Sequence, residues 1–182
     1  YIDDATSRIL HAESVTVEDT FNLMRSTEIY LRKHGRCVAF YVDKDSIYTI
    51  NRKASIDEEL RDSNPITQFT RAMTELGIEV ILANSPQAKG RVERSFDTHQ
   101  DRLVKELRLA GISDMAAGNV FLHTVYIDDH NARFAVDPAS PTNAHRPLLG
   151  DQRLDQILSR RTERSMANDY SVSFQKRFFQ LS

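Results

Sequence analysis

Two acidic residues stand at positions where a carboxylate could do metal chemistry. Asp43 follows an apolar run, residues 37–42, which is typical of a strand buried on both faces. In open α/β sheets, ligands and metals collect at the carboxyl ends of the strands, which is where this Asp would lie. Glu93 follows a predicted loop, residues 84–90, which contains Pro86 and Gly90, and it lies one turn into a predicted long helix.

Each acid also has an ordinary structural explanation, and taken singly neither residue requires a chemical role. An Asp directly after a strand commonly caps the amides of a turn, as Asp43 would. An acid near the start of a helix is stabilised by the helix dipole, and Glu93 is flanked by Arg91 and Arg94. Whether the two acids act together depends on the elements that position them.

Alternating strands and helices are predicted around these acids. Runs of strand-forming residues predict strands at 8–15, 37–42, 78–82 and, as one or two strands, 170–181. Apolar residues at helical spacing predict helices at 16–35, 65–76, 91–110 and 114–130. Thr16 is the predicted N-cap of the first helix and Gly35 its end. Pro65 is the predicted start of the second helix and Gly77 its end.

The two ends of the chain have their own patterns. Residues 3–7 are a polar turn that would reverse a preceding strand into residues 8–15, which predicts a hairpin. The chain opens without Met in a strand-like segment, which we interpret as a fragment of a longer protein. Residues 137–147 contain three prolines and are typical of a linker.

The composition predicts one soluble domain with a tail. The chain has 182 residues, 40% of them hydrophobic, which is enough for one sizeable core. The single Cys37 excludes a disulfide framework and a multi-cysteine zinc site, which favours the cytosol. No apolar run reaches the roughly 20 residues of a membrane span. The net charge is −2, but residues 84–108 balance to +2 and residues 144–182 are also basic.

Three segments together resemble the DDE transposases of the retroviral-integrase superfamily. Residues 84–94, Asn-Ser-Pro-Gln-Ala-Lys-Gly-Arg-Val-Glu-Arg, resemble the catalytic loop and the helix that bears the last catalytic acid. Residues 42–46, Val-Asp-Lys-Asp-Ser, resemble the strand end that carries the second acid. Residues 2–9, Ile-Asp-Asp-Ala-Thr-Ser-Arg-Ile, resemble the turn between the second and third strands. The likeness covers residues 1–136 and is greatest to bacterial insertion-sequence transposases.

The resemblance implies an α/β protein with a ribonuclease H-like fold, in which helices flank a mixed sheet. Its division would be a catalytic core at 1–136 that lacks its first strand, a linker at 137–169, and the beginning of a small C-terminal β-barrel at 170–182. The 49 residues between Asp43 and Glu93 exceed the spacing in retroviral integrases, and we interpret the excess as a loop inserted at 44–64.

The resemblance also implies the site. Asp43 and Glu93 would be catalytic and would ligate two Mg²⁺ or Mn²⁺ ions, hard cations that prefer carboxylate oxygens. Two such ions about 3.5–4 Å apart can activate the attacking oxygen and stabilise the leaving 3′-oxygen of a phosphodiester. The first catalytic Asp of the family would lie upstream of Tyr1. Asp3 and Asp4, in the turn at the other end of the sheet, are interpreted as structural.

The predicted partner is DNA, both transposon ends and target. The predicted DNA contacts all lie in the loop and helix around Glu93: Asn84, Gln87, Lys89, Arg91 and Arg94. For the basic residues among them, an ordinary solvated helix face is an equal alternative. The resemblance further implies a homo-oligomer assembled on DNA, in the bacterial cytoplasm and on the nucleoid when bound, with no membrane association.

Three functions remain open from the sequence. The leading hypothesis is a transposase core that cleaves DNA and transfers strands, inactive in this chain because one metal-binding Asp is absent. The second is a DNA-binding or assembly module without catalysis, from a decayed or domesticated element. The third is a ribonuclease H-like nuclease, because a metal cage alone does not identify the acceptor.

Overall fold

The computed structural model describes residues 1–50, 65–83 and 86–180, and within residues 86–95 it describes the backbone only. The predicted insertion at 44–64 therefore lies mostly outside the described residues. No helix in the described ranges combines the length and the apolar character needed to cross a membrane.

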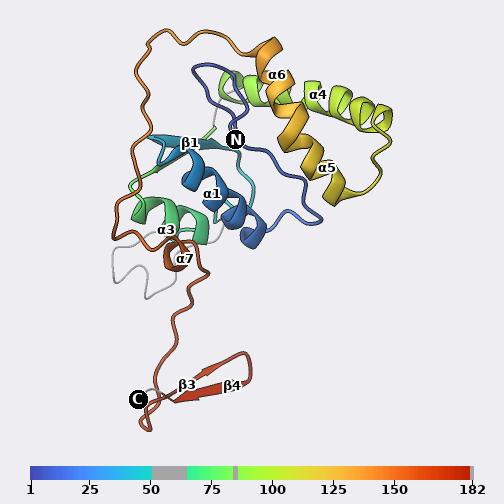
Figure 1. The fold of residues 1–182 in the computed structure, drawn as a ribbon. Helices are drawn as coiled ribbons and strands as arrows, with labels where there is room; N and C mark the ends of the chain where they lie inside the picture. Colours follow the sequence, from blue (N-terminus) through green and yellow to red (C-terminus); the bar gives the residue numbers. More distant parts are fainter. Residues whose placement is uncertain (51–64, 84–85, 181–182) are drawn as a thin grey trace.

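A short parallel sheet forms the centre of the fold (Figure 1). Strand β1, Ala39–Val42, pairs with β2, Glu79–Leu82, so that Val42 lies opposite Leu82 at their carboxyl ends. This pairing confirms the prediction that the strand before Asp43 lies beside residues 78–82. The expectation that the first strand is buried on both faces was wrong, because the Tyr41 side chain is 58% exposed.

Helix α1, Thr20–His34, precedes β1 and begins later than predicted. Asp19 caps it by accepting the backbone N–H of Asn22, so the predicted cap at Thr16 was wrong. An Asp three residues before a free amide satisfies one of the helix's unpaired donors. Gly35 ends the helix as predicted, at a φ of 80°.

Helix α3, Gln68–Glu75, lies between β1 and β2 along the chain. Thr67 caps it by accepting the Thr70 N–H, so Pro65 precedes the helix rather than starting it. Gly77, at a φ of 65°, turns the chain into β2. The left-handed conformation explains why a glycine stands at this turn.

The main core lies where α1 and α3 pack on the sheet. Leu31 of α1 and Ala72, Met73 and Leu76 of the α3 segment are fully buried. Helix α7, Leu154–Ile157, adds Leu154, Ile157 and Leu158 to the same cluster. This part of the predicted 137–169 linker is therefore packed into the core, while the division of the chain into domains remains a prediction.

A second group of helices packs against the N-terminal segment, where Ile9 joins a small core cluster with Leu122, Tyr126 and Ile127 (Figure 1). It comprises α4, Pro86–Leu109; α5, Met115–Phe121; a π-helical segment, Leu122–Tyr126; and α6, Ile127–Phe134. The helix predicted from residue 114 is confirmed, since Asp114 caps α5. The predicted loop at 84–90 was wrong from Pro86 onwards, because α4 begins there; Pro is favoured at a first helical position.

The N-terminal hairpin is reduced to a single antiparallel bridge between Ile2 and Ile9, and residues 8–15 form no regular strand. The predicted turn is present: the Ser7 N–H donates to the Asp3 carbonyl at 2.8 Å. Asn131 of α6 replaces a strand partner for Ile9, donating to its carbonyl at 2.9 Å and accepting its N–H at 2.8 Å. A side-chain amide thus satisfies this buried backbone.

The C-terminal residues form an antiparallel hairpin, β3 Ser171–Phe174 and β4 Arg177–Gln180, which confirms the predicted strands. Figure 1 shows it set apart from the body of the protein at the end of an extended connection. The described residues contain no closed barrel. The ribonuclease H-like architecture and the C-terminal β-barrel therefore remain predictions.

Candidate active site

Asp43 lies immediately after β1, at the carboxyl end of the parallel pair, and its side chain is exposed. One carboxylate oxygen, Oδ1, accepts the Asp45 N–H at 3.0 Å. Asp43 therefore does cap a turn, as its structural explanation requires. A carboxylate has further lone pairs and this one faces solvent, so the same residue also fits a role as a metal ligand.

The chain brings the start of α4 to the same end of the sheet. The Ala83 N–H donates to the Val42 carbonyl at 2.8 Å, which extends the β1–β2 pairing to the residue before Asp43. Helix α4 begins at Pro86, three residues later, and three residues span at most about 10 Å. The helix that carries Glu93 thus departs from the sheet edge at which Asp43 lies.

Glu93 lies two turns into α4 rather than one, because the helix includes Pro86 to Gly90. Its side chain lies outside the described residues, so the predicted approach of Asp43 and Glu93 remains a prediction. In the described part of the chain, no three His, Cys, Asp or Glu side chains are grouped to hold a metal. Asp43 is the member of the predicted metal cage whose side chain is described.

The predicted DNA contacts occupy the first turns of the same helix. Gln87, Lys89, Arg91 and Arg94 all lie in α4, whereas Asn84 lies outside the described residues. Helical spacing places positions 87, 91 and 94 on one face of α4, whereas positions 89 and 93 share a face on nearly the opposite side of the helix. Their role in binding DNA remains a prediction.

Asp3 and Asp4 lie in the N-terminal turn rather than at the carboxyl edge of the sheet. The Asp3 carboxylate accepts both the backbone N–H and the hydroxyl of Thr6. Asp3 thus has the structural role expected for it.

Aromatic and charged side chains of α4 contact the π-helical segment and α6. His99 Nδ1 lies 2.9 Å from the Tyr126 hydroxyl, and the His99 and His130 rings are 4.6 Å apart. Arg102 lies over the Phe134 ring, 5.0 Å from its centroid. His99 is therefore a packing residue, and its contacts hold the helix on which Glu93 stands.

Acidification is expected to loosen this attachment. Burial, with a smaller contribution from His130, lowers the pKa of His99 to about 4 from 6.5. Because the unfolded chain takes up the proton first, stability is complete above about pH 6.5 and falls as the pH drops towards 4. In His99→Phe, urea unfolding should therefore show a smaller loss of stability between pH 7 and pH 5. An unchanged difference would exclude His99 as a source of the pH dependence.

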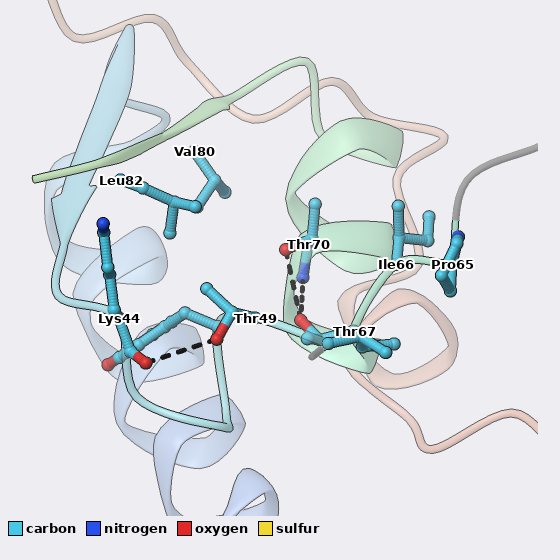
Figure 2. Close-up of a pocket in the computed structure, with 10 residues that line it drawn as sticks. Lys44, Thr49, Pro65, Ile66, Thr67, Thr70, Val80 and Leu82 are labelled. Atoms are coloured by element: carbon cyan, nitrogen blue, oxygen red, sulfur yellow. Dashed lines mark hydrogen bonds between the residues drawn. The ribbon is translucent and has the colours of Figure 1, made fainter. Parts of the chain in front are cut away.

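Sequence reasoning missed a cavity beside Asp43. It has a volume of about 510 Å³ and lies between the sheet, the loop after β1 and the start of α3 (Figure 2). Its lining includes Lys44, Thr67, Thr70 and Leu82. No local signal in the sequence could have indicated the cavity, because its lining comes from three separate segments of the chain.

Two curated proteins resemble nearly the whole chain. A protein named as a transposase, y4bF of Sinorhizobium fredii, is 42% identical over 177 residues, 97% of this chain. The chain is similar to bacterial transposases. The transposase for insertion sequence IS1202 of Streptococcus pneumoniae is 33% identical over 178 residues, 98% of this chain. No protein-family model and no solved structure matches the chain.

The similarity to these transposases concerns one part of their length. The chain spans 37% of each relative. The aligned region contains both Asp43 and Glu93, since it omits only a few residues of this chain.

Proposed function

We propose that this chain is the catalytic core of a DDE-type transposase that cleaves DNA and transfers strands with two Mg²⁺ or Mn²⁺ ions. The similarity of nearly its whole length to two named transposases carries this proposal. The position of Asp43 supports it, because an exposed carboxylate stands at the carboxyl end of a parallel strand. The departure of α4 from that same edge supports the inclusion of Glu93.

In this mechanism Asp43 and Glu93 would hold the cations, and an Asp from an upstream segment would complete the ligand set. When bound, the two cations would supply activation of the attacking oxygen and stabilisation of the leaving 3′-oxygen. The protein would contribute by positioning the two acids. Strand β1 positions Asp43, and the contacts of His99 and Arg102 position the helix that bears Glu93. Asn84, Gln87, Lys89, Arg91 and Arg94 would orient the DNA strand beside them.

The charge distribution supports DNA as the partner. Residues 1–158 carry a net charge of −5, whereas residues 159–182 carry +3. The connection at residues 159–170 and the whole of β4 are exposed. A basic, accessible tail on an acidic body favours contact with phosphates in one region of the protein. Assembly as a homo-oligomer on paired DNA ends, in the cytoplasm, completes the proposal.

The experiment compares this 182-residue chain with a protein extended upstream by the segment that supplies the first Asp. With Mg²⁺ or Mn²⁺, the extended protein should cleave DNA that carries its transposon end, and the shorter chain should show little or no activity. Two carboxylates would hold two closely spaced cations poorly. Circular dichroism would first establish that both are folded. Robust metal-dependent cleavage by the shorter chain would show that the first acid has been misplaced.

A further inference from the structure

The cavity beside Asp43 combines an apolar lining with a single cationic side chain. Ile50, Ile66, Val80 and Leu82 contribute apolar surface, and Lys44 stands at the strand end (Figure 2). The volume of about 510 Å³ falls within the range of small-molecule sites, which are mostly apolar with a few placed polar groups. This combination suits a ligand with an apolar body and an anionic group.

Among the described residues that line the cavity, Thr70 has a hydroxyl that can donate to a ligand. The Thr67 hydroxyl donates to Thr70 Oγ1 at 3.1 Å and accepts the Thr70 N–H at 3.1 Å. The Thr49 hydroxyl is directed to the carbonyls of Lys44 and Asp45. The Thr70 hydroxyl, which is an acceptor in its bond with Thr67, can therefore donate to an acceptor in the cavity.

Lys44 supplies the cation. Among the described residues, no carboxylate forms an ion pair with the Lys44 ammonium group. Its side chain rises towards Leu82 at the mouth of the cavity (Figure 2). An exposed ammonium group adjoining an apolar cavity favours an anionic ligand group such as a phosphate.

We propose that this cavity receives one unstacked nucleotide of the DNA substrate, with the base among the apolar side chains and a phosphate at Lys44. The inference rests on the proposed function, because that function supplies DNA as the ligand. A base has apolar faces and acceptor atoms at its edge, which match the apolar lining and the Thr70 hydroxyl. Unstacking a base costs a few kcal/mol, which a pocket of this kind can offset. A nucleotide held here would set which phosphate reaches Asp43.

The test measures binding of thymidine 5′-monophosphate and deoxyadenosine 5′-monophosphate to the 182-residue chain without metal. Amide resonances of Thr67, Thr70 and Val80 should shift in a saturable way. Deoxyribose 5-phosphate, which lacks a base, and inorganic phosphate should bind at least about tenfold more weakly, because they forgo the contact with the apolar lining. Equal binding of inorganic phosphate would show an anion site only and overturn the proposal.

Matched substitutions assign the binding to the cavity. Lys44→Met should weaken nucleotide binding about tenfold, as expected for the loss of a charge-assisted hydrogen bond, whereas the exposed Lys33→Met should not. Thr70→Leu fills the cavity and removes its hydroxyl, and Thr74→Leu, one turn further along α3 and exposed, is its control. Equal weakening by Thr74→Leu, or no binding by the parent chain at millimolar nucleotide, would overturn the proposal.

One substitution distinguishes failure of the nucleotide-binding proposal from failure of the proposed catalytic function. Asp43→Asn should leave metal-free nucleotide binding within about twofold, because the cavity lining does not include Asp43. Loss of binding in this variant would show that the nucleotide lies on Asp43 rather than in the cavity. In the upstream-extended protein, cleavage that survives Asp43→Asn would instead overturn the catalytic assignment and leave the binding result unaffected.

Discussion

Asp43→Asn and Glu93→Gln, each introduced into the upstream-extended protein, should lower the rate of metal-dependent DNA cleavage by about 10²–10⁴-fold. Each substitution removes one negative charge and one strong oxygen ligand from a site that must hold two divalent ions. Stabilisation of the reacting oxygens by a metal is worth several kcal/mol, and each 1.36 kcal/mol corresponds to a tenfold change in rate. Single-turnover cleavage of end-labelled DNA with Mg²⁺ measures the effect directly.

The matched controls carry the same chemical change elsewhere. Glu79→Gln lies on an exposed position at the opposite end of β2, and Asp128→Asn lies on an exposed position of α6. Both should retain activity within about threefold of the parent, since surface substitutions rarely change stability by more than about 0.5 kcal/mol. Cleavage that survives both Asp43→Asn and Glu93→Gln would show that the carboxylates of the site lie elsewhere.

Gly35→Ala should destabilise the fold by roughly 2–4 kcal/mol. Gly35 has a φ of 80°, and a Cβ at this position would lie 2.5 Å from the Arg146 carbonyl oxygen. An alanine at position 35 must therefore strain the backbone and displace the extended segment that contains Arg146. Urea unfolding followed by circular dichroism measures the loss.

The segment around Arg146, which lies against Gly35, connects the C-terminal part of the chain to the core through hydrogen bonds. The Arg36 and Arg146 backbones exchange hydrogen bonds of 2.7 and 2.8 Å. The Arg146 guanidinium donates to the Gly77 carbonyl at 2.7 Å, and that of Arg36 donates to the Leu76 carbonyl at 2.9 Å. Cations at these carbonyls also complement the negative end of α3. Displacing Arg146 therefore disturbs both α1 and α3.

Gly150→Ala is the control for this substitution. A Cβ at Gly150 would meet no heavy atom within 4 Å, and its φ is not positive. Its effect on the free energy of unfolding should stay within about 0.5 kcal/mol of the parent, because the substitution meets no steric clash and reduces unfolded-state entropy. Equal stability of the two variants would contradict the strain assigned to Gly35.

The elements that surround the site could be predicted because their signals are local. The apolar run before Asp43 and the shorter run at 78–82 predicted both strands and their pairing. Gly35 and Gly77 marked the ends of two helices. The helix starts were less predictable, since Thr16 and Asp19 are both good caps and only the packing of α1 selects Asp19.

The long-range features could not be predicted for a physical reason. Helix α7 is four residues long, too short to show a hydrophobic period, and its burial depends on α1 and α3. The contact between Arg36 and Arg146 joins residues 110 positions apart, and no local sequence pattern predicts it. The cavity requires β2, the loop after β1 and α3 to be in place before its lining exists.

Of the two predicted catalytic acids, Asp43 is the one whose side chain lies within the described residues. Asp43 lies at the carboxyl end of β1, as its position after an apolar run indicated. The placement of Glu93 in a long helix was also predicted, but the helix begins before the predicted loop ends. Pro86 was interpreted as part of a loop, whereas proline is equally compatible with a first helical turn.

Binding of Mn²⁺ to the upstream-extended protein tests most directly the claim that Asp43 and Glu93 belong to one metal site. Mn²⁺ is paramagnetic and broadens the amide resonances of residues close to it. Substoichiometric Mn²⁺ should broaden the resonances of Asp43 and Glu93 together, at the same metal concentration, and Asp43→Asn should abolish both effects. Broadening at one of the two residues alone, or at Glu93 unchanged by Asp43→Asn, would contradict a shared site.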